Sequence, residues 1–98
     1  MILRSAPVCP LTLAAWRLGG LTLSDLWGRY LCLGGGHPQA SLAAYLHGAA
    51  AWADIEHNVL AQALNEGLWD VGLPSLAPHR EPEAAARDAA PGTRRPSP

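Results

Sequence analysis

The stretch DIEHNVLAQALNEGLWDV, residues 54–71, decides the fold expected for this chain. On a helix, where each residue turns by about 100°, its apolar side chains fall in one broad sector. The members of that sector are Val59, Leu60, Ala63, Leu64, Gly67, Leu68 and Val71. An apolar arc this wide needs cover on more than one side. We therefore predict that residues 54–71 form the central helix of a small bundle, with Asp54 as its N-cap and Gly72 ending it.

Composition supports an all-α fold. Apolar residues make up 49% of the 98 residues, and the chain contains no Phe. Leu and Ala supply most of this content, and they favour helices over strands. Ninety-eight residues allow one domain at most.

Two segments before the central helix have clear helical signals. Residues 22–33 begin with Thr22 and Asp25 in a capping pattern and end at a run of three glycines. We expect Asp25 to pair with Arg29, four residues along on the exposed side. A second helix opens at Pro38, and Gly48 is its expected end. One continuous helix over residues 38–71 is the alternative, and we favour the break.

The two ends of the chain are patterned more weakly. In residues 1–20, Thr12 could cap a short helix over residues 13–18, which would add a fourth helix. Residues 77–98 are rich in Pro, Ala and Arg and have almost no large apolar side chains. We therefore predict a weakly patterned segment over residues 1–20, a helical domain of three or four helices over residues 21–76, and a disordered tail over residues 77–98.

Three boxes of sequence carry a family resemblance. They are LWGRYLCLGG (residues 26–35), AYLHG (residues 44–48) and HNVLAQALNE (residues 57–66). Together, over about residues 21–80, they resemble a family of small helical proteins from high-GC Gram-positive bacteria that has no known activity. The resemblance implies a helical fold, and it carries over no catalytic residue, cofactor or partner, because none is established for that family. This chain has Ser41 and Ala44 where acidic residues would be expected in the second helix.

The sequence contains no recognisable metal-binding or catalytic motif. His37, His47 and His57 lie ten residues apart, with Cys32 nearby, but zinc sites are built from closely spaced ligand pairs. We predict no metal and no cofactor, and we expect His57 to be a packed side chain. The sequence also contains no nucleophile elbow and no phosphate-binding glycine loop, so we predict neither catalysis nor a small-molecule substrate.

The compartment is predicted from weak features. No apolar run approaches the roughly 20 residues of a membrane span, so we expect no membrane association. Pro7 and Pro10 interrupt the apolar N-terminal stretch, and no Ala-x-Ala-like site follows it. We therefore predict a cytoplasmic location.

A protein contact is the function that the sequence favours. Trp69 projects among the polar residues of the central helix, where an indole needs cover. We predict a non-catalytic interaction or regulatory module that forms a homodimer or binds another protein. The predicted contact residues are Trp69, Gln62, Asn65 and Asn58. The alternative is that the N-terminal segment or residues 73–78 of the same chain cover Trp69.

Nucleic-acid binding is the second hypothesis. Two helices around a glycine turn have the outline of a helix-turn-helix. However, the net charge is −1, and the central helix carries four carboxylates and no basic residue. Phosphates would be repelled, so this function is disfavoured.

Overall fold

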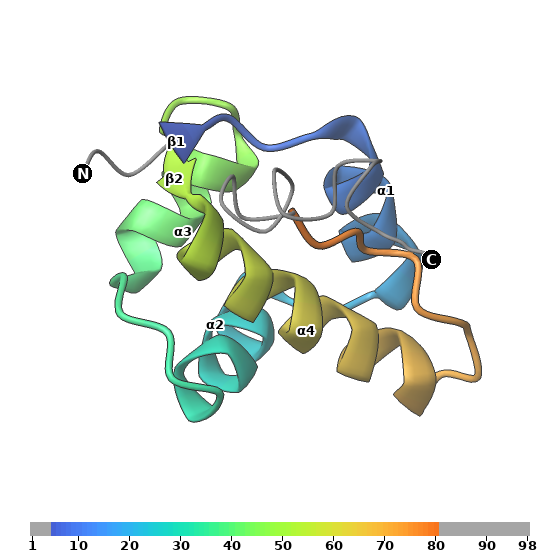
Figure 1. Ribbon diagram of the computed structural model, residues 1–98. Helices are drawn as coiled ribbons and strands as arrows, with labels where there is room; N and C mark the ends of the chain where they lie inside the picture. The colour runs from blue at the N-terminus through green and yellow to red at the C-terminus, as the bar shows by residue number, and fades with distance from the viewer. Residues whose placement is uncertain (1–4, 81–98) are drawn as a thin grey trace, which may run out of the picture.

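The computed structural model describes residues 5–80, which form four helices and one small sheet (Figure 1). The elements in order are β1 (Ser5–Ala6), α1 (Pro10–Gly19), α2 (Leu23–Cys32), α3 (Gln39–Leu46), β2 (Trp52–Ala53) and α4 (Asp54–Asp70). The two strands are antiparallel, with Ser5 opposite Ala53 and Ala6 opposite Trp52. The predicted helical fold is confirmed, and the N-terminal segment supplies the fourth helix.

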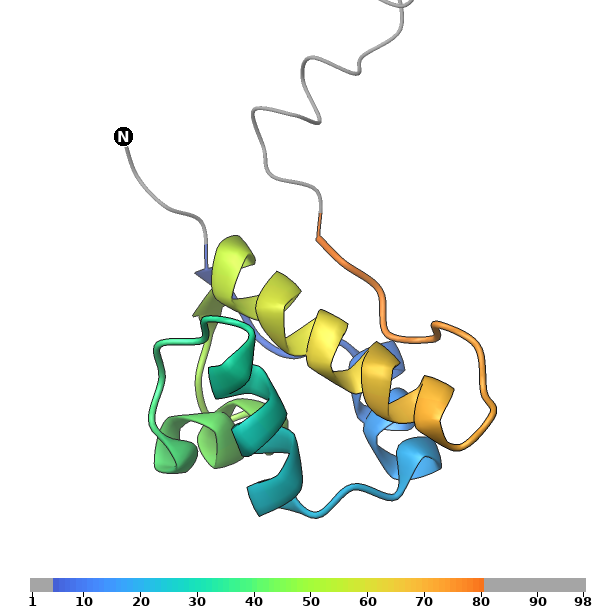
Figure 2. The same cartoon turned by 90° about the horizontal axis from the view of Figure 1, so that it is seen from below.

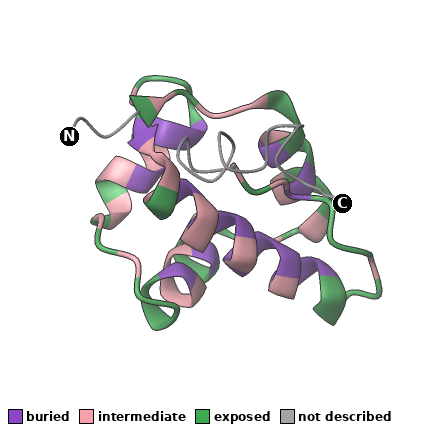
Figure 3. Ribbon diagram, in the orientation of Figure 1, coloured by how far each residue is buried: buried purple, intermediate pink, exposed green. Residues whose placement is uncertain are grey.

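Helix α4 lies at the centre of the arrangement. It packs against α1 on one side and α2 on the other, and Figures 1 and 2 show it running across the whole molecule. Five residues of the predicted apolar sector are buried: Leu60, Ala63, Leu64, Gly67 and Leu68. Val59 is half-buried, and Val71 lies beyond the helix and is exposed. Figure 3 shows buried positions along the length of α4 and exposed ones at its C-terminal end.

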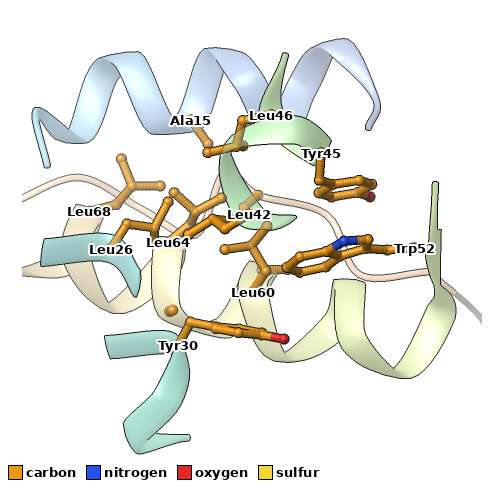
Figure 4. Close-up of a cluster of buried hydrophobic side chains, with 13 residues drawn as sticks. Ala15, Leu26, Tyr30, Leu42, Tyr45, Leu46, Trp52, Leu60, Leu64 and Leu68 are labelled. Atoms are coloured by element: carbon orange, nitrogen blue, oxygen red, sulfur yellow. The ribbon is translucent and has the colours of Figure 1, made fainter. Parts of the chain in front are cut away.

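The core combines leucines with a group of aromatic rings (Figure 4). Trp52 is 2% exposed and stacks on Tyr45, with ring centroids 4.6 Å apart and planes at 5°. Tyr30 lies on another side of Trp52, at 5.3 Å between centroids. The chain has no Phe, so tyrosine and tryptophan fill this volume, and their polar atoms need hydrogen-bond partners.

Helix α2 begins as predicted, but its expected ion pair is wrong. Thr22 is the N-cap, and its hydroxyl accepts from the Asp25 backbone N–H at 3.0 Å. Arg29 pairs with Asp70 at the end of α4 instead of with Asp25. This pair links two helices across the surface, which a pattern within one helix could not reveal.

The break between the second and the central helix is confirmed. Helix α3 ends at Leu46, and Gly48 follows with a left-handed φ of 80°. Strand β2 then leads directly into α4. Asp54 is the first residue of α4 and not its cap, because Ala53 holds the N-cap position.

The domain extends further at both ends than predicted. Helix α1 begins at Pro10, and Thr12 is a buried residue inside it, bonded to the Cys9 thiol, rather than its cap. At the other end, Ala77 is only 3% exposed, so the predicted boundary of the tail at residue 77 is wrong for residues 77–80. The rest of the predicted disordered tail, residues 81–98, lies outside the described residues.

Two glycines near the end of α2 provide a test of the packing. A Cβ on Gly35 would lie 2.3 Å from the Tyr30 ring, whereas one on Gly28 would meet nothing within 4 Å. We expect Gly35→Ala to lower the free energy of unfolding by about 2 kcal/mol, because the buried ring would have to move. We expect Gly28→Ala, inside α2, to raise it by about 0.5 to 1 kcal/mol. Urea unfolding of both variants measures this contrast, and equal effects would contradict the packing around Tyr30.

Candidate functional site

The segment that follows α4 turns back along it. Residues 73–80, here called the strap, run along α4 in the opposite direction to the helix, as the orange segment of Figures 1 and 2 shows. Leu73 packs against the core, and its N–H donates to the Leu68 carbonyl at 2.8 Å. Gly72 makes the reversal with a left-handed φ of 83°.

Two asparagines of α4 hold the backbone of the strap. The Asn65 Nδ2 donates to the Ala77 carbonyl at 3.0 Å, and the Ala77 N–H donates to the Asn65 Oδ1 at 2.9 Å. Asn58 makes the same pair of bonds with the carbonyl and N–H of Arg80, at 2.9 and 2.6 Å. Each asparagine therefore satisfies both backbone groups of one strap residue.

The Arg80 side chain enters a pocket of acceptors and is only 16% exposed. Its acceptors are the carbonyls of Trp52 (2.7 Å), Ala6 (2.9 Å) and Pro7 (3.2 Å), the Tyr45 hydroxyl (2.6 Å) and the Asp54 carboxylate (3.2 Å). These groups come from the N-terminal segment, α3, β2 and the start of α4. The planar guanidinium reaches all of them because it has five N–H groups in a fixed fork.

His57 and Tyr45 form a buried chain of hydrogen bonds beside Arg80. The His57 Nε2 lies 3.0 Å from the Pro78 carbonyl, which can only accept, so this nitrogen carries the proton. The Nδ1 then accepts from the Tyr45 hydroxyl at 2.7 Å. Burial raises the pKa of Tyr45 to about 12, although Arg80 opposes this, and the phenol therefore stays protonated. Burial lowers the pKa of His57, and the Arg80 cation adds to this, so the imidazole is held neutral.

A second polar group lies where the end of α2 meets the start of α4. The Tyr30 hydroxyl donates to Glu56 and accepts from the backbone N–H groups of Gly36 and His37 at 3.0 and 2.8 Å. Burial and the neighbouring carboxylate raise the pKa of Tyr30 to about 12. Burial opposes ionisation of Glu56, but the hydrogen bonds from Tyr30 and Gly36 outweigh it and lower its pKa.

The structure separates the four predicted contact residues. Asn58 and Asn65 bind the strap of their own chain, and Asn65 is 4% exposed, so the strap occupies these two predicted contact residues in this conformation. Gln62 is half-buried and donates to Glu66 at 3.2 Å. Trp69 is 50% exposed, and its Nε1 donates to the Ser75 hydroxyl at 2.8 Å. The alternative that residues 73–78 cover Trp69 therefore holds only in part, because Ser75 bonds the indole while half of the side chain stays exposed.

Arg80 is the residue of this site that sequence reasoning missed. It lies in a stretch with the composition of a disordered tail, and its acceptors are mostly backbone carbonyls. One signal was present: Asn58 and Asn65 lie seven residues, or two helical turns, apart on one face of α4. Two amides at this spacing can hold an extended backbone alongside a helix.

The three histidines and Cys32 that the sequence analysis weighed as a metal site do not form one cluster. Among the residues that the structure describes, no three His, Cys, Asp or Glu side chains lie together in a way that could hold a metal ion. Cys9 and Cys32 both carry free thiols. His37 stacks on Trp52 at 4.2 Å between centroids, His47 is exposed at the end of α3, and His57 is the packed histidine that the sequence predicted. Within residues 5–80, no helix has both the length and the apolar character needed to span a bilayer.

Comparisons with known proteins found no matching family model, no matching curated protein and no matching solved structure. The family resemblance of the three sequence boxes therefore stays a prediction, and the geometry carries the proposals below.

The neutral state of His57 makes stability depend on pH. The pKa of His57 is lowered in the folded chain. As the pH falls, His57 is therefore protonated in the unfolded chain near pH 6.5 and in the folded chain only at a lower pH. The contribution of His57 to stability is therefore complete above about pH 6.5 and is lost as the pH falls below it. We expect the melting temperature to fall between about pH 7.5 and pH 5.5 more steeply in the native chain than in His57→Gln. The exposed His47→Gln is the matched control and should keep the native slope. Equal slopes for the native chain and His57→Gln would contradict this account.

Asn65 should determine whether the strap stays in place. Asn65→Ala leaves the buried Ala77 N–H and carbonyl without partners, and we expect a loss of about 2 to 3 kcal/mol in stability. We also expect faster hydrogen exchange at the Ala77 amide, measured by NMR. Gln62→Ala, on the same helix and bonded only to Glu66 among the described residues, should change neither quantity by much. Unchanged exchange at Ala77 in Asn65→Ala would show that other contacts hold the strap.

Proposed function

We propose that this protein is a small non-catalytic interaction module that binds a second protein chain through the C-terminal end of α4. The contact surface is made of Trp69, Val71 and Leu76, and we call it the Trp69 surface. The half-exposed indole of Trp69 is the observation that carries the proposal.

The exposure of these three side chains supports a contact. Trp69 is 50% exposed, Val71 56% and Leu76 41%. The bond from Trp69 to Ser75 brings the strap beside the indole, so residues from α4, the turn and the strap lie together. The indole is also fixed in orientation by this bond, and rigid aromatic side chains next to polar groups are typical of binding hot spots.

A second copy of this chain is the partner that we propose. Arg29 and Asp70 form an ion pair at the edge of this surface, with side chains 33% and 61% exposed. An edge that carries both charges can be complementary to itself, because the Arg29 of each copy can pair with the Asp70 of the other across a two-fold axis. The small size of the domain adds to this, since folded units of fewer than about 80 residues bury little surface and gain from association.

The charges of the described region argue against nucleic acid as the partner. Residues 5–80 contain three arginines and five carboxylates, and two of those arginines are paired with Asp54 and Asp70. Phosphate binding depends on an excess of positive charge. The cytoplasmic location stays a prediction of the sequence.

Truncation of Trp69 tests the function. We expect Trp69→Ala to weaken self-association by about thirtyfold or more, measured by sedimentation velocity over a range of concentrations, because a hot-spot aromatic contributes about 2 kcal/mol or more. The helix content of the variant should stay unchanged by circular dichroism, since half of the ring is already in solvent.

Ile55 provides the matched control. It lies at the other end of α4 and is 68% exposed, so Ile55→Ala removes an apolar side chain from the same helix without touching the Trp69 surface. Self-association should be unaffected by this change. A native chain that stays monomeric at all concentrations, or equal losses in the two variants, would overturn the proposal.

A further inference from the structure

The strap is held as a bound peptide would be held, and this sets it apart from an ordinary piece of core. Between residues 75 and 80, Ala77 is the only buried residue, while Leu76 and His79 are exposed. The strap is held mainly by hydrogen bonds to its backbone and by those of the Arg80 side chain. A segment fixed by polar groups and little apolar burial can open without unfolding the leucine core.

The spacing of the two asparagines matches an extended chain. Asn58 and Asn65 are two turns apart, which is about 10 Å along the helix axis. Their partners Arg80 and Ala77 are three residues apart, and three extended residues also span about 10 Å. The two pairs therefore remain in register only for an extended backbone that runs antiparallel to α4.

The contacts also define a short sequence preference. The position bound by Asn65 must be small, because Ala77 is 3% exposed there. The next position offers its carbonyl to His57, and proline suits it because its fixed φ favours an extended chain. The third position is open, since His79 points to solvent. The fourth is an arginine, whose guanidinium enters the pocket formed by Asp54, Tyr45 and the three carbonyls.

We propose that this face of α4 is a peptide-binding surface that accepts an extended segment of another protein with the pattern small–Pro–any–Arg, and that the strap occupies it in cis. The arginine pocket contains a carboxylate, a phenol oxygen and backbone carbonyls, so its charge complements a guanidinium. The proposal does not rest on Trp69 or Val71, which lie at the C-terminal end of the same helix.

The strap competes with any such peptide. A segment joined to its site by a short turn has an effective concentration in the millimolar range. A free peptide therefore binds the native chain weakly, and it binds better when the anchor of the strap is removed. Arg80→Ala removes that anchor and leaves every residue of the pocket in place.

The experiment uses a fluorescein-labelled peptide with the sequence of residues 73–81, LPSLAPHRE, and the full-length chain. We expect the dissociation constant measured by fluorescence anisotropy to be at least about tenfold lower for Arg80→Ala than for the native chain. Adding Asn58→Ala to Arg80→Ala should abolish most of this gain, because one backbone clamp is lost. A peptide with alanine in place of its arginine should bind Arg80→Ala at least about tenfold more weakly than the arginine peptide.

Three results would overturn the proposal. They are equal affinity of the native chain and Arg80→Ala, equal affinity for the two peptides, and a dimer with exchanged straps that takes up no peptide. Trp69→Ala leaves every residue of the peptide site in place and should bind the peptide at least as tightly as the native chain does, so a failure of the Trp69 surface and a failure of the peptide site are distinguishable.

If Arg80→Ala does not fold, the native chain gives the answer by itself. An NMR titration with the unlabelled arginine peptide should increase hydrogen exchange at the backbone amides of Ala77 and Arg80 in the strap, while the amides of Leu60 and Leu64 in α4 stay protected. No change at the strap amides at millimolar peptide would contradict exchange between the strap and a free peptide.

Discussion

The requirement that buried polar groups have hydrogen-bond partners governs this structure. Helix α4 buries His57 and Asn65 as well as its leucines. Tyr45 of α3 bonds one ring nitrogen of His57, but the other ring nitrogen and the Asn65 amide are bonded outside the helices. The strap supplies these partners through the carbonyls of Pro78 and Ala77. An unpaired polar group in such a place costs about 1 to 3 kcal/mol, so the central helix depends on a segment in which Ala77 is the only buried residue.

Arg80 extends this dependence to the other end of the chain. Its guanidinium bonds the carbonyls of Ala6 and Pro7 next to β1 and that of Trp52 in β2. The small sheet, the aromatic stack on Trp52 and the strap therefore meet at one charged side chain. Because Tyr45 both accepts from Arg80 and donates to His57, a change in any of the three alters the hydrogen bonding of the others.

The sequence predicted the parts of the fold that depend on local rules. The Thr22 cap, the glycine after α3 and most of the apolar sector of α4 follow from dihedral preferences and helical periodicity. The ion pair of Arg29 with Asp70 and the five hydrogen bonds of the Arg80 side chain could not be predicted in this way, because they join residues far apart in sequence. The boundary at residue 77 was misjudged for a related reason: composition measures apolar burial, and residues 77–80 are held mainly through their backbone.

The two proposed contact surfaces are linked through one residue. Ser75 accepts from the Trp69 indole at the start of the strap, and Ala77 begins the backbone clamp two residues later. A peptide that displaced the strap would remove this bond and the neighbouring Leu76 from the indole, because Leu76 belongs to the strap itself. The Trp69 surface is therefore complete only while the strap lies on α4. If both surfaces bind proteins, peptide binding and self-association oppose each other, and by linkage each lowers the affinity of the other by the same factor.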